Sequence, residues 1–110
     1  MGEIKVRDRI LQKIKEAQEK QLDELDLSND WDTPDQYKLT EIPEEVFELK
    51  HLKILNLRNH KISHIPESLD KLTSLNTIDL RGNPLEEPPL EIIRQGVEAI
   101  KKYFEQLKKM

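Results

Sequence analysis

The chain has 110 residues, a length that suits one domain with one hydrophobic core. Hydrophobic residues make up 35%, charged residues 36%, and the net charge is −4, so we expect a thin or elongated core and no attachment to nucleic acid or to anionic membranes. The absence of cysteine excludes disulfides and zinc–thiolate sites, and the absence of a long apolar run disfavours a signal peptide or a membrane span, so a cytoplasmic location is expected.

The first twenty residues have the pattern of an amphipathic helix. Their apolar side chains fall on one side of a helix, and lysine and glutamate occupy the rest of its surface. The apolar positions are Ile4, Val6, Ile10, Leu11, Ile14 and Ala17. We therefore expect residues 1–20 to form a helix that packs one face against the segment that follows.

Residues 21–88 repeat a short apolar pattern three times. The segments that begin at Leu52 and Leu75 superimpose at an offset of 23 residues, and an earlier copy begins at Leu22. That copy is longer because WDTPDQY, residues 31–37, is inserted in it. Each copy contains two apolar residues separated by a polar one, as in a short strand: Leu25 and Leu27, Leu55 and Leu57, Ile78 and Leu80. The sequence predicts about three short strands that stack in parallel, because one repeat cannot bury its own face.

A second shared half follows the strand motif in the first two copies. Its apolar residues recur every three positions, the spacing of a tight helical turn. These are Val46, Leu49 and Leu52 in one copy and Leu69, Leu72 and Leu75 in the next. We expect short helical turns that carry the chain back across the core on the convex side.

Residues 89–110 predict a second amphipathic helix, introduced by Pro88 and Pro89. The expected core stripe of one continuous helix consists of Leu90, Ile93, Val97, Ile100, Phe104 and Leu107. Gly96 lies inside this stretch and should weaken the helix by about 1 kcal/mol relative to alanine, a cost that packing should override.

The pattern L-x-x-L-x-L-x-x-N-x-L, from about Leu22 to Leu90, resembles the leucine-rich repeat family. The resemblance implies an α/β solenoid with about three short parallel strands, short helical turns on the convex side and an amphipathic capping helix at each terminus. The expected single domain, residues 1–110, then consists of a cap at 1–20, three repeats at 21–88 and a cap at 89–110.

The two ends are similar to the repeat domains of bacterial Roco-type proteins, in which a closing helix like NPLEEPPLEIIRQGVEAIKKYFEQL precedes a Ras-like GTPase domain. The chain has no G-x-x-x-x-G-K-[ST] motif, and its three glycines are scattered. It therefore has no loop that could hold the phosphates of GTP.

The resemblance also implies a column of asparagines that satisfy backbone groups where each strand turns. Here that column contains Asp30, His60 and Asn83. An ionised aspartate cannot donate a hydrogen bond, and a neutral histidine can donate one and accept one. We expect local irregularity at the first two of these positions.

The solvent-facing positions of the predicted strands are the first candidate binding site. They would form the concave face, and the candidates for partner binding there are Asp26, Ile54, Asn56, Arg58, Thr77, Asp79 and Arg81. Paired arginines could grip a carboxylate or a polar peptide through bidentate hydrogen bonds. The alternative is a solvated face on which Asp79 pairs with Arg58 or Arg81.

Two further candidates involve exposed apolar side chains. Trp31 and Tyr37 lie in the inserted segment, which either contacts a partner through them or folds Trp31 or Tyr37 back to plug a gap beside the first cap. Ile92 and Tyr103 form, with Ala99, a second apolar stripe on the closing helix, which either docks a neighbouring domain or a second copy or packs locally.

No cofactor, metal or catalytic residue is predicted. The acidic residues of the insertion lack the glycine of a calcium loop, and His60 and His64 have no third ligand nearby. The leading interpretation is a non-catalytic protein–protein interaction module, the recognition or regulatory part of a signalling protein, present as a monomer or weak homodimer. The alternative is an assembly element that self-associates or docks a neighbouring domain through its closing helix.

Overall fold

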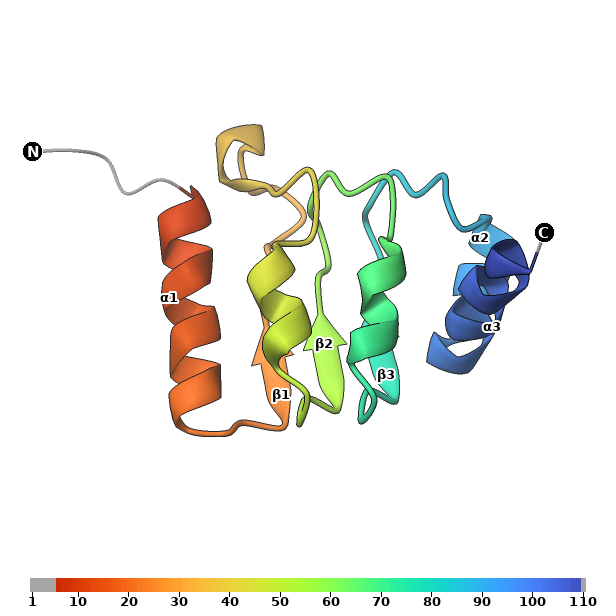
Figure 1. The fold of residues 1–110 in the computed structure, drawn as a ribbon. Helices are drawn as coiled ribbons and strands as arrows, with labels where there is room; N and C mark the ends of the chain where they lie inside the picture. The colour runs from red at the N-terminus through yellow and green to blue at the C-terminus, as the bar shows by residue number, and fades with distance from the viewer. Residues whose placement is uncertain (1–5, 110) are drawn as a thin grey trace, which may run out of the picture.

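The computed structural model describes residues 6–109, which fold into an elongated molecule of 51 × 29 × 20 Å (Figure 1). Within this range there are three short strands: β1 (Glu24–Asp26), β2 (Ile54–Asn56) and β3 (Thr77–Asp79). Three α-helices of the described residues flank them: α1 (Val6–Glu19), α2 (Leu90–Ile93) and α3 (Val97–Lys108). The connections contain three 3₁₀ helices: η1 (Asp35–Tyr37), η2 (Glu44–Glu48) and η3 (Glu67–Lys71).

The strands form one open parallel sheet in the order β1-β2-β3. Leu25 pairs with Leu55, and Leu55 pairs with Ile78, so equivalent positions of the repeat lie side by side. The predicted parallel strands are confirmed, and their register follows from the repeat, since a slip of one residue would turn the leucines out of the core.

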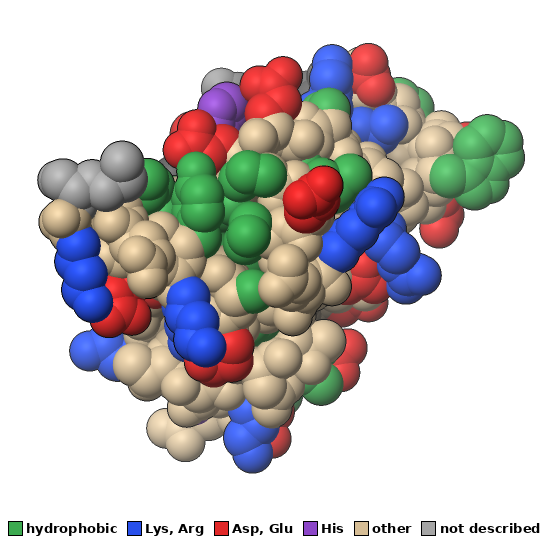
Figure 2. Space-filling view, turned by 90° about the vertical axis from the view of Figure 1, so that its right-hand side faces the viewer, with side chains coloured by type: hydrophobic (Ala, Val, Ile, Leu, Met, Phe, Trp, Pro, Cys, Tyr) green, Lys and Arg blue, Asp and Glu red, His purple; other side chains and the backbone are tan. Residues whose placement is uncertain are grey.

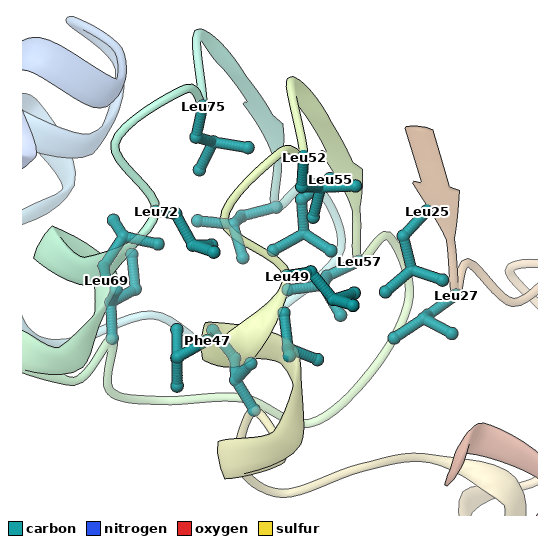
Figure 3. Packing of buried hydrophobic residues seen from close by; sticks show 14 of the residues in the cluster. Leu25, Leu27, Phe47, Leu49, Leu52, Leu55, Leu57, Leu69, Leu72 and Leu75 are labelled. Atoms are coloured by element: carbon teal, nitrogen blue, oxygen red, sulfur yellow. The ribbon is translucent and has the colours of Figure 1, made fainter. Parts of the chain in front are cut away.

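The core lies between the sheet and the 3₁₀ helices. Leu49, Leu52, Leu55 and Leu57 are all 0% exposed, and Figure 3 shows leucines from the strands and from the opposite connections pointing toward one another. Prolines precede both η2 and η3 and begin them with a fixed φ. The predicted helical turns are therefore present, as 3₁₀ helices that match the three-residue spacing.

Helix α1 lies beside β1 (Figure 1) and also contacts η2. Ile10, Ile14 and Ala17 are buried against the core, and Leu11 is partly buried. Of the apolar positions predicted for this helix, Ile4 lies outside the described residues. The buried residues Ile10, Ile14 and Ala17 recur at three- and four-residue intervals on one face of an uninterrupted helix.

The C-terminal segment differs from the prediction of one continuous helix. It forms two helices, α2 and α3, separated at Gly96, whose φ of 100° lies outside the right-handed helical region. The break takes α2 out of the helical phase of α3. Leu90, expected in the core, is consequently 45% exposed. Leu107, also expected there, lies in the last turn of α3 and is 41% exposed.

Helix α3 packs on η3. Val97, Ile100 and Phe104 are buried, and Lys101 Nζ donates a hydrogen bond to the carbonyl of Leu72 at 2.8 Å. The central part of the predicted core stripe is therefore correct, and it holds the helix against the third repeat.

Asn83 satisfies backbone groups where β3 turns. Its Nδ2 donates to the carbonyls of Leu57 and Leu80, both at 2.9 Å. Its Oδ1 accepts from the backbone N–H of Ile62 at 3.1 Å. One side chain therefore links this turn to the preceding repeat.

His60 makes the equivalent contacts one repeat earlier, so the expected irregularity at this position is wrong. Its Nε2 donates to the carbonyl of Leu27, and its Nδ1 accepts from the Leu39 N–H at 2.9 Å. The imidazole is 2% exposed, and burial lowers its pKa, which favours the neutral form with one donor and one acceptor. At Asp30 the side chain is exposed, and its carbonyl accepts from Thr33 N at 3.1 Å in a local turn.

Candidate functional site

The solvent-facing side chains of the sheet form three rows across the strands. We call the surface that these rows make the open sheet face. The pairing of β1, β2 and β3 places equivalent residues in one row. The rows are Glu24, Ile54 and Thr77; Asp26, Asn56 and Asp79; and, just beyond the strand ends, Ser28, Arg58 and Arg81. The structure thus brings together all seven candidates predicted for this face, on neighbouring strands.

The middle row has a structural role that its position in the repeat explains. Asp26 Oδ1 accepts a hydrogen bond from the backbone N–H of Ser28 at 2.9 Å. Asn56 makes the same contact to Arg58 N at 3.1 Å, and the next strand repeats it. A short side chain with an oxygen acceptor bends the chain as each strand ends, so aspartate and asparagine are interchangeable in this row.

Asp79 joins the two arginines of the open sheet face. Arg81 donates from Nε to Oδ1 at 3.0 Å and from Nη2 to Oδ2 at 2.8 Å, while Arg58 Nε lies 3.6 Å from Oδ2. The side-chain hydrogen bonds from Arg81 lower the pKa of Asp79. The predicted alternative of an ion-paired face therefore describes this arrangement.

The pairing leaves both arginines with donors to spare. The Arg81 side chain is 76% exposed and that of Arg58 is 42% exposed. The buried Nε of Arg58 makes no hydrogen bond among the described residues. An arriving carboxylate could share these guanidinium groups with Asp79 or replace it.

The inserted segment keeps Trp31 outside the fold. Trp31 is 84% exposed, so the interpretation that it plugs a gap near the first helix is wrong. Tyr37 is 37% exposed and lies under Arg9 of α1, whose guanidinium carbon is 5.9 Å from the ring centroid. The turn from Asp30 to Thr33 directs the chain away from the core before η1 brings Tyr37 back.

The predicted stripe of Ile92 and Tyr103 does not lie on one helix, because Ile92 belongs to α2 and Tyr103 to α3. Both side chains are partly buried against the core, and the Tyr103 ring meets Phe104 edge-on at 5.5 Å between centroids. They therefore support the C-terminal helices and are only partly available to a partner.

Hydrophobic side chains nevertheless gather on the C-terminal end of the molecule, which faces the viewer in Figure 2. Leu90 and Leu107 are the large exposed apolar residues of these helices. Sequence reasoning placed both in the core. For Leu90, the signal that could have corrected this placement is Gly96, the residue best able to adopt a positive φ and end a helix.

Among residues 6–109, no three His, Asp or Glu side chains lie close enough together to hold a metal ion. His60 binds backbone groups, and His64 Nδ1 lies 2.8 Å from the hydroxyl of Ser63. The helices of the described part of the chain are all too short or too polar to cross a membrane.

A comparison with protein families matches residues 35–85 to the family described as Leucine rich repeat. The match runs from η1 to the turn after β3. It therefore includes the two turns whose backbone groups are bound by His60 and Asn83. No curated protein matches the chain.

Proposed function

Because the chain belongs to the leucine-rich repeat family, whose repeats are typically non-catalytic and mediate protein–protein interaction, we propose that it binds a protein or peptide on the open sheet face. The observation that supports this most is the row of Arg58 and Arg81 beside Asp79, with donors left exposed. Nearby Ile54, half-buried, adds an apolar contact.

The rest of the proposal concerns the domain that carries this face, its location and its oligomeric state. We take residues 1–110 as one solenoid domain in which α1 caps the first repeat and α2 and α3 cap the last. The domain acts in the cytoplasm as a monomer or weak homodimer, as the recognition part of a signalling protein. The net charge of −4 opposes nonspecific binding to nucleic acid or anionic membranes.

The proposed recognition is an exchange of carboxylates. In the free chain Asp79 occupies the fork of Arg81 at 2.8 Å. A partner's aspartate or glutamate would take over one arginine while Asp79 keeps the other, so no guanidinium loses its counter-charge. Exposed ion pairs contribute only about 0–1 kcal/mol, and this low cost makes the exchange feasible.

A charge-reversed variant tests the open sheet face. We expect Arg58→Glu with Arg81→Glu to lose the partners that the wild-type chain retains in affinity capture. The matched control, Lys50→Glu with Lys102→Glu, makes the same change of charge at exposed positions outside this face. An identical set of partners for all three proteins would contradict the proposal.

Trp31 provides an independent readout because it is the one tryptophan of the chain. An exposed tryptophan is the residue type most often found at the energetic centre of an interface. If a partner also covers the inserted segment, the emission of Trp31 shifts to shorter wavelength on binding, and Trp31→Ala weakens the affinity by about tenfold or more. An unchanged emission spectrum at saturation would confine the partner to the sheet.

A second candidate function is assembly through the C-terminal helices, which the exposed Leu90 and Leu107 favour. We expect light scattering over a concentration series to show a mass that rises toward a dimer, and Leu107→Glu to abolish the rise. A mass that stays monomeric at high concentration would remove this candidate while leaving the first intact.

A further inference from the structure

The outer edge of β3 carries unpaired backbone groups. On the inner side, Thr77 N donates to Lys53 O at 3.1 Å, and Asp79 O accepts from Leu57 N at 2.8 Å. The residue between them, Ile78, directs its N–H and C=O away from β2, as alternate residues of a parallel strand must. Neither group of Ile78, nor the N–H of Leu80, has a hydrogen-bond partner among residues 6–109.

A cleft lies along this edge, between β3 and α2, with a volume of about 610 Å³. Its apolar lining consists of Ile78, Leu80, Leu85, Leu90 and Ile93. Leu90 is 45% exposed, and Ile78 and Ile93 are only partly buried. The C-terminal helices stand beyond β3 at this end of the sheet (Figure 1), where α3 packs on η3 and α2 packs on α3.

The charges around the cleft favour an acidic occupant. The charged residues that line it are Asp79, Arg81 and Arg94. Asp79 and Arg81 neutralise each other through two hydrogen bonds. Arg94 is exposed, and no carboxylate of the described chain lies within ion-pair distance of it. One positive charge is therefore left without a counter-charge beside an apolar wall.

We propose that this cleft binds an extended acidic segment of another protein, which joins the edge of β3 as a fourth strand. The backbone of the segment pairs with Ile78 and Leu80, alternate apolar side chains enter the cleft toward Leu90 and Ile93, and a carboxylate meets Arg94. Strand addition of this kind takes affinity from backbone hydrogen bonds and specificity from the alternate side chains. The proposal rests on the proposed function in taking a protein as ligand, but it places that ligand on a different surface.

Amide hydrogen exchange with a defined peptide tests the strand pairing. The probe is a fluorescein-labelled peptide of about six residues that alternates valine and glutamate, the length of a typical strand. We expect binding by fluorescence anisotropy, together with exchange at Ile78 and Leu80 that slows by about tenfold or more. The same peptide with N-methylated valines and glutamates, and a valine–lysine peptide, should not bind. Binding without slower exchange at these two amides, or equal binding of the N-methylated peptide, would overturn the proposal.

Paired variants locate the peptide in the cleft. We expect Arg94→Glu to weaken binding by about tenfold or more, because a charge-assisted contact becomes a repulsion, and Lys102→Glu on α3 to leave it unchanged. Leu90→Asp should also weaken binding, while Leu107→Asp, at a similarly exposed position outside the cleft, should not. Equal effects within either pair would contradict the assignment of the cleft.

Two further measurements separate this proposal from its alternatives. Arg58→Glu alters the open sheet face but not the lining of the cleft, so it should weaken a partner of the sheet face and leave peptide binding unchanged. A second copy of the chain as occupant would instead slow exchange at Ile78 and Leu80 as the protein concentration rises without peptide. That result would overturn the assignment to another protein.

Discussion

Helix α1 packs beside β1 with Ile10, Ile14 and Ala17 buried, whereas the β3 side meets α2 across a cleft of about 610 Å³. Both ends of the chain carry amphipathic helical segments, but only the first is uninterrupted. At the second, Gly96 breaks the helix and leaves Leu90 exposed.

The difference between the two ends follows from helical phase: the uninterrupted helix α1 keeps its apolar residues on one face, and the segment broken at Gly96 does not. In α1 the buried residues recur at three- and four-residue intervals on one face. Across Gly96 that phase is lost, so α3 is held by Ile100 and Phe104 while α2 turns its apolar residues toward the cleft. Stability should therefore be concentrated at the β1 end and binding at the β3 end.

Matched substitutions should give the largest difference between the two ends. Ile14→Ala should lower the free energy of unfolding by about 2–5 kcal/mol, since Ile14 is 3% exposed and its removal leaves a cavity. Ile93→Ala, at a partly buried position open to the cleft, should cost less than half as much. Urea denaturation measures both values. Equal losses would mean that the β3 end is closed as tightly as the β1 end.

The sequence predicted the repeated strands and turns and missed the break in the C-terminal helix. The strands, their register and the turns followed from the repeat because Leu25, Leu55 and Ile78 occupy equivalent positions. The division of the C-terminal segment did not follow, since a single Gly96 is tolerated inside many helices at a cost of about 1 kcal/mol. In the structure the break falls at Gly96, whose φ of 100° is not helical.

His60, nearer the β1 end, makes hydrogen bonds to backbone groups that are equivalent to those of Asn83. His60→Leu fills a similar volume but leaves the Leu39 N–H and the Leu27 carbonyl unpaired. We expect a loss of about 1–3 kcal/mol in the free energy of unfolding. His60→Asn should cost less, because an amide also donates and accepts. A larger loss for asparagine than for leucine in urea denaturation would show that the hydrogen bonds of His60 contribute little.

The sequence predicted which residues lie on the candidate site, but it did not decide how their side chains pair or whether they are exposed. The rows of the open sheet face follow from the alternation of side chains along each strand, so Asp26, Asn56 and Asp79 could be placed in advance. Whether Asp79 holds the arginines, and whether Trp31 folds inward, depends on side-chain rotamers and on a turn of a few residues that no repeat specifies. His60 was misjudged because one donor and one acceptor were expected to be too few at this position, whereas Nε2 and Nδ1 pair with the Leu27 carbonyl and the Leu39 N–H.

The free energy of unfolding should depend on pH through His60 and not through Asn83, because an asparagine side chain does not titrate. In the folded chain the pKa of His60 is lowered by burial, and the side chains of Asn29 and Lys38 also disfavour a proton on the ring. As pH falls below about 6.5, the unfolded chain takes up a proton that the folded chain refuses, so stability falls by up to about 1.4 kcal/mol per pH unit. The loss continues until the pH reaches the lowered pKa.

Thermal unfolding between neutral pH and about pH 5 measures this effect, above the range where carboxylates of ordinary pKa titrate. The control is His60→Asn, whose melting temperature should depend less on pH over that interval. His51 and His64 remain in both proteins, so they cancel in the difference. An unchanged slope in the variant would show that His60 is not the group responsible.

The smallest expected effect concerns the ion pairs of the open sheet face. Asp79→Asn keeps an acceptor for the Arg81 backbone N–H, as Asn56 does for Arg58, and removes only the charge. Because the Arg81 side chain is 76% exposed, the loss of stability should stay below about 1 kcal/mol and shrink in high salt. Asp26→Asn, at the same row beside α1, is the matched control, since Asp26 binds Ser28 and makes no ion pair among the described residues. A loss of several kcal/mol for Asp79→Asn in urea denaturation would mean that the arginines stabilise the β3 end and are not free to exchange carboxylates with a partner.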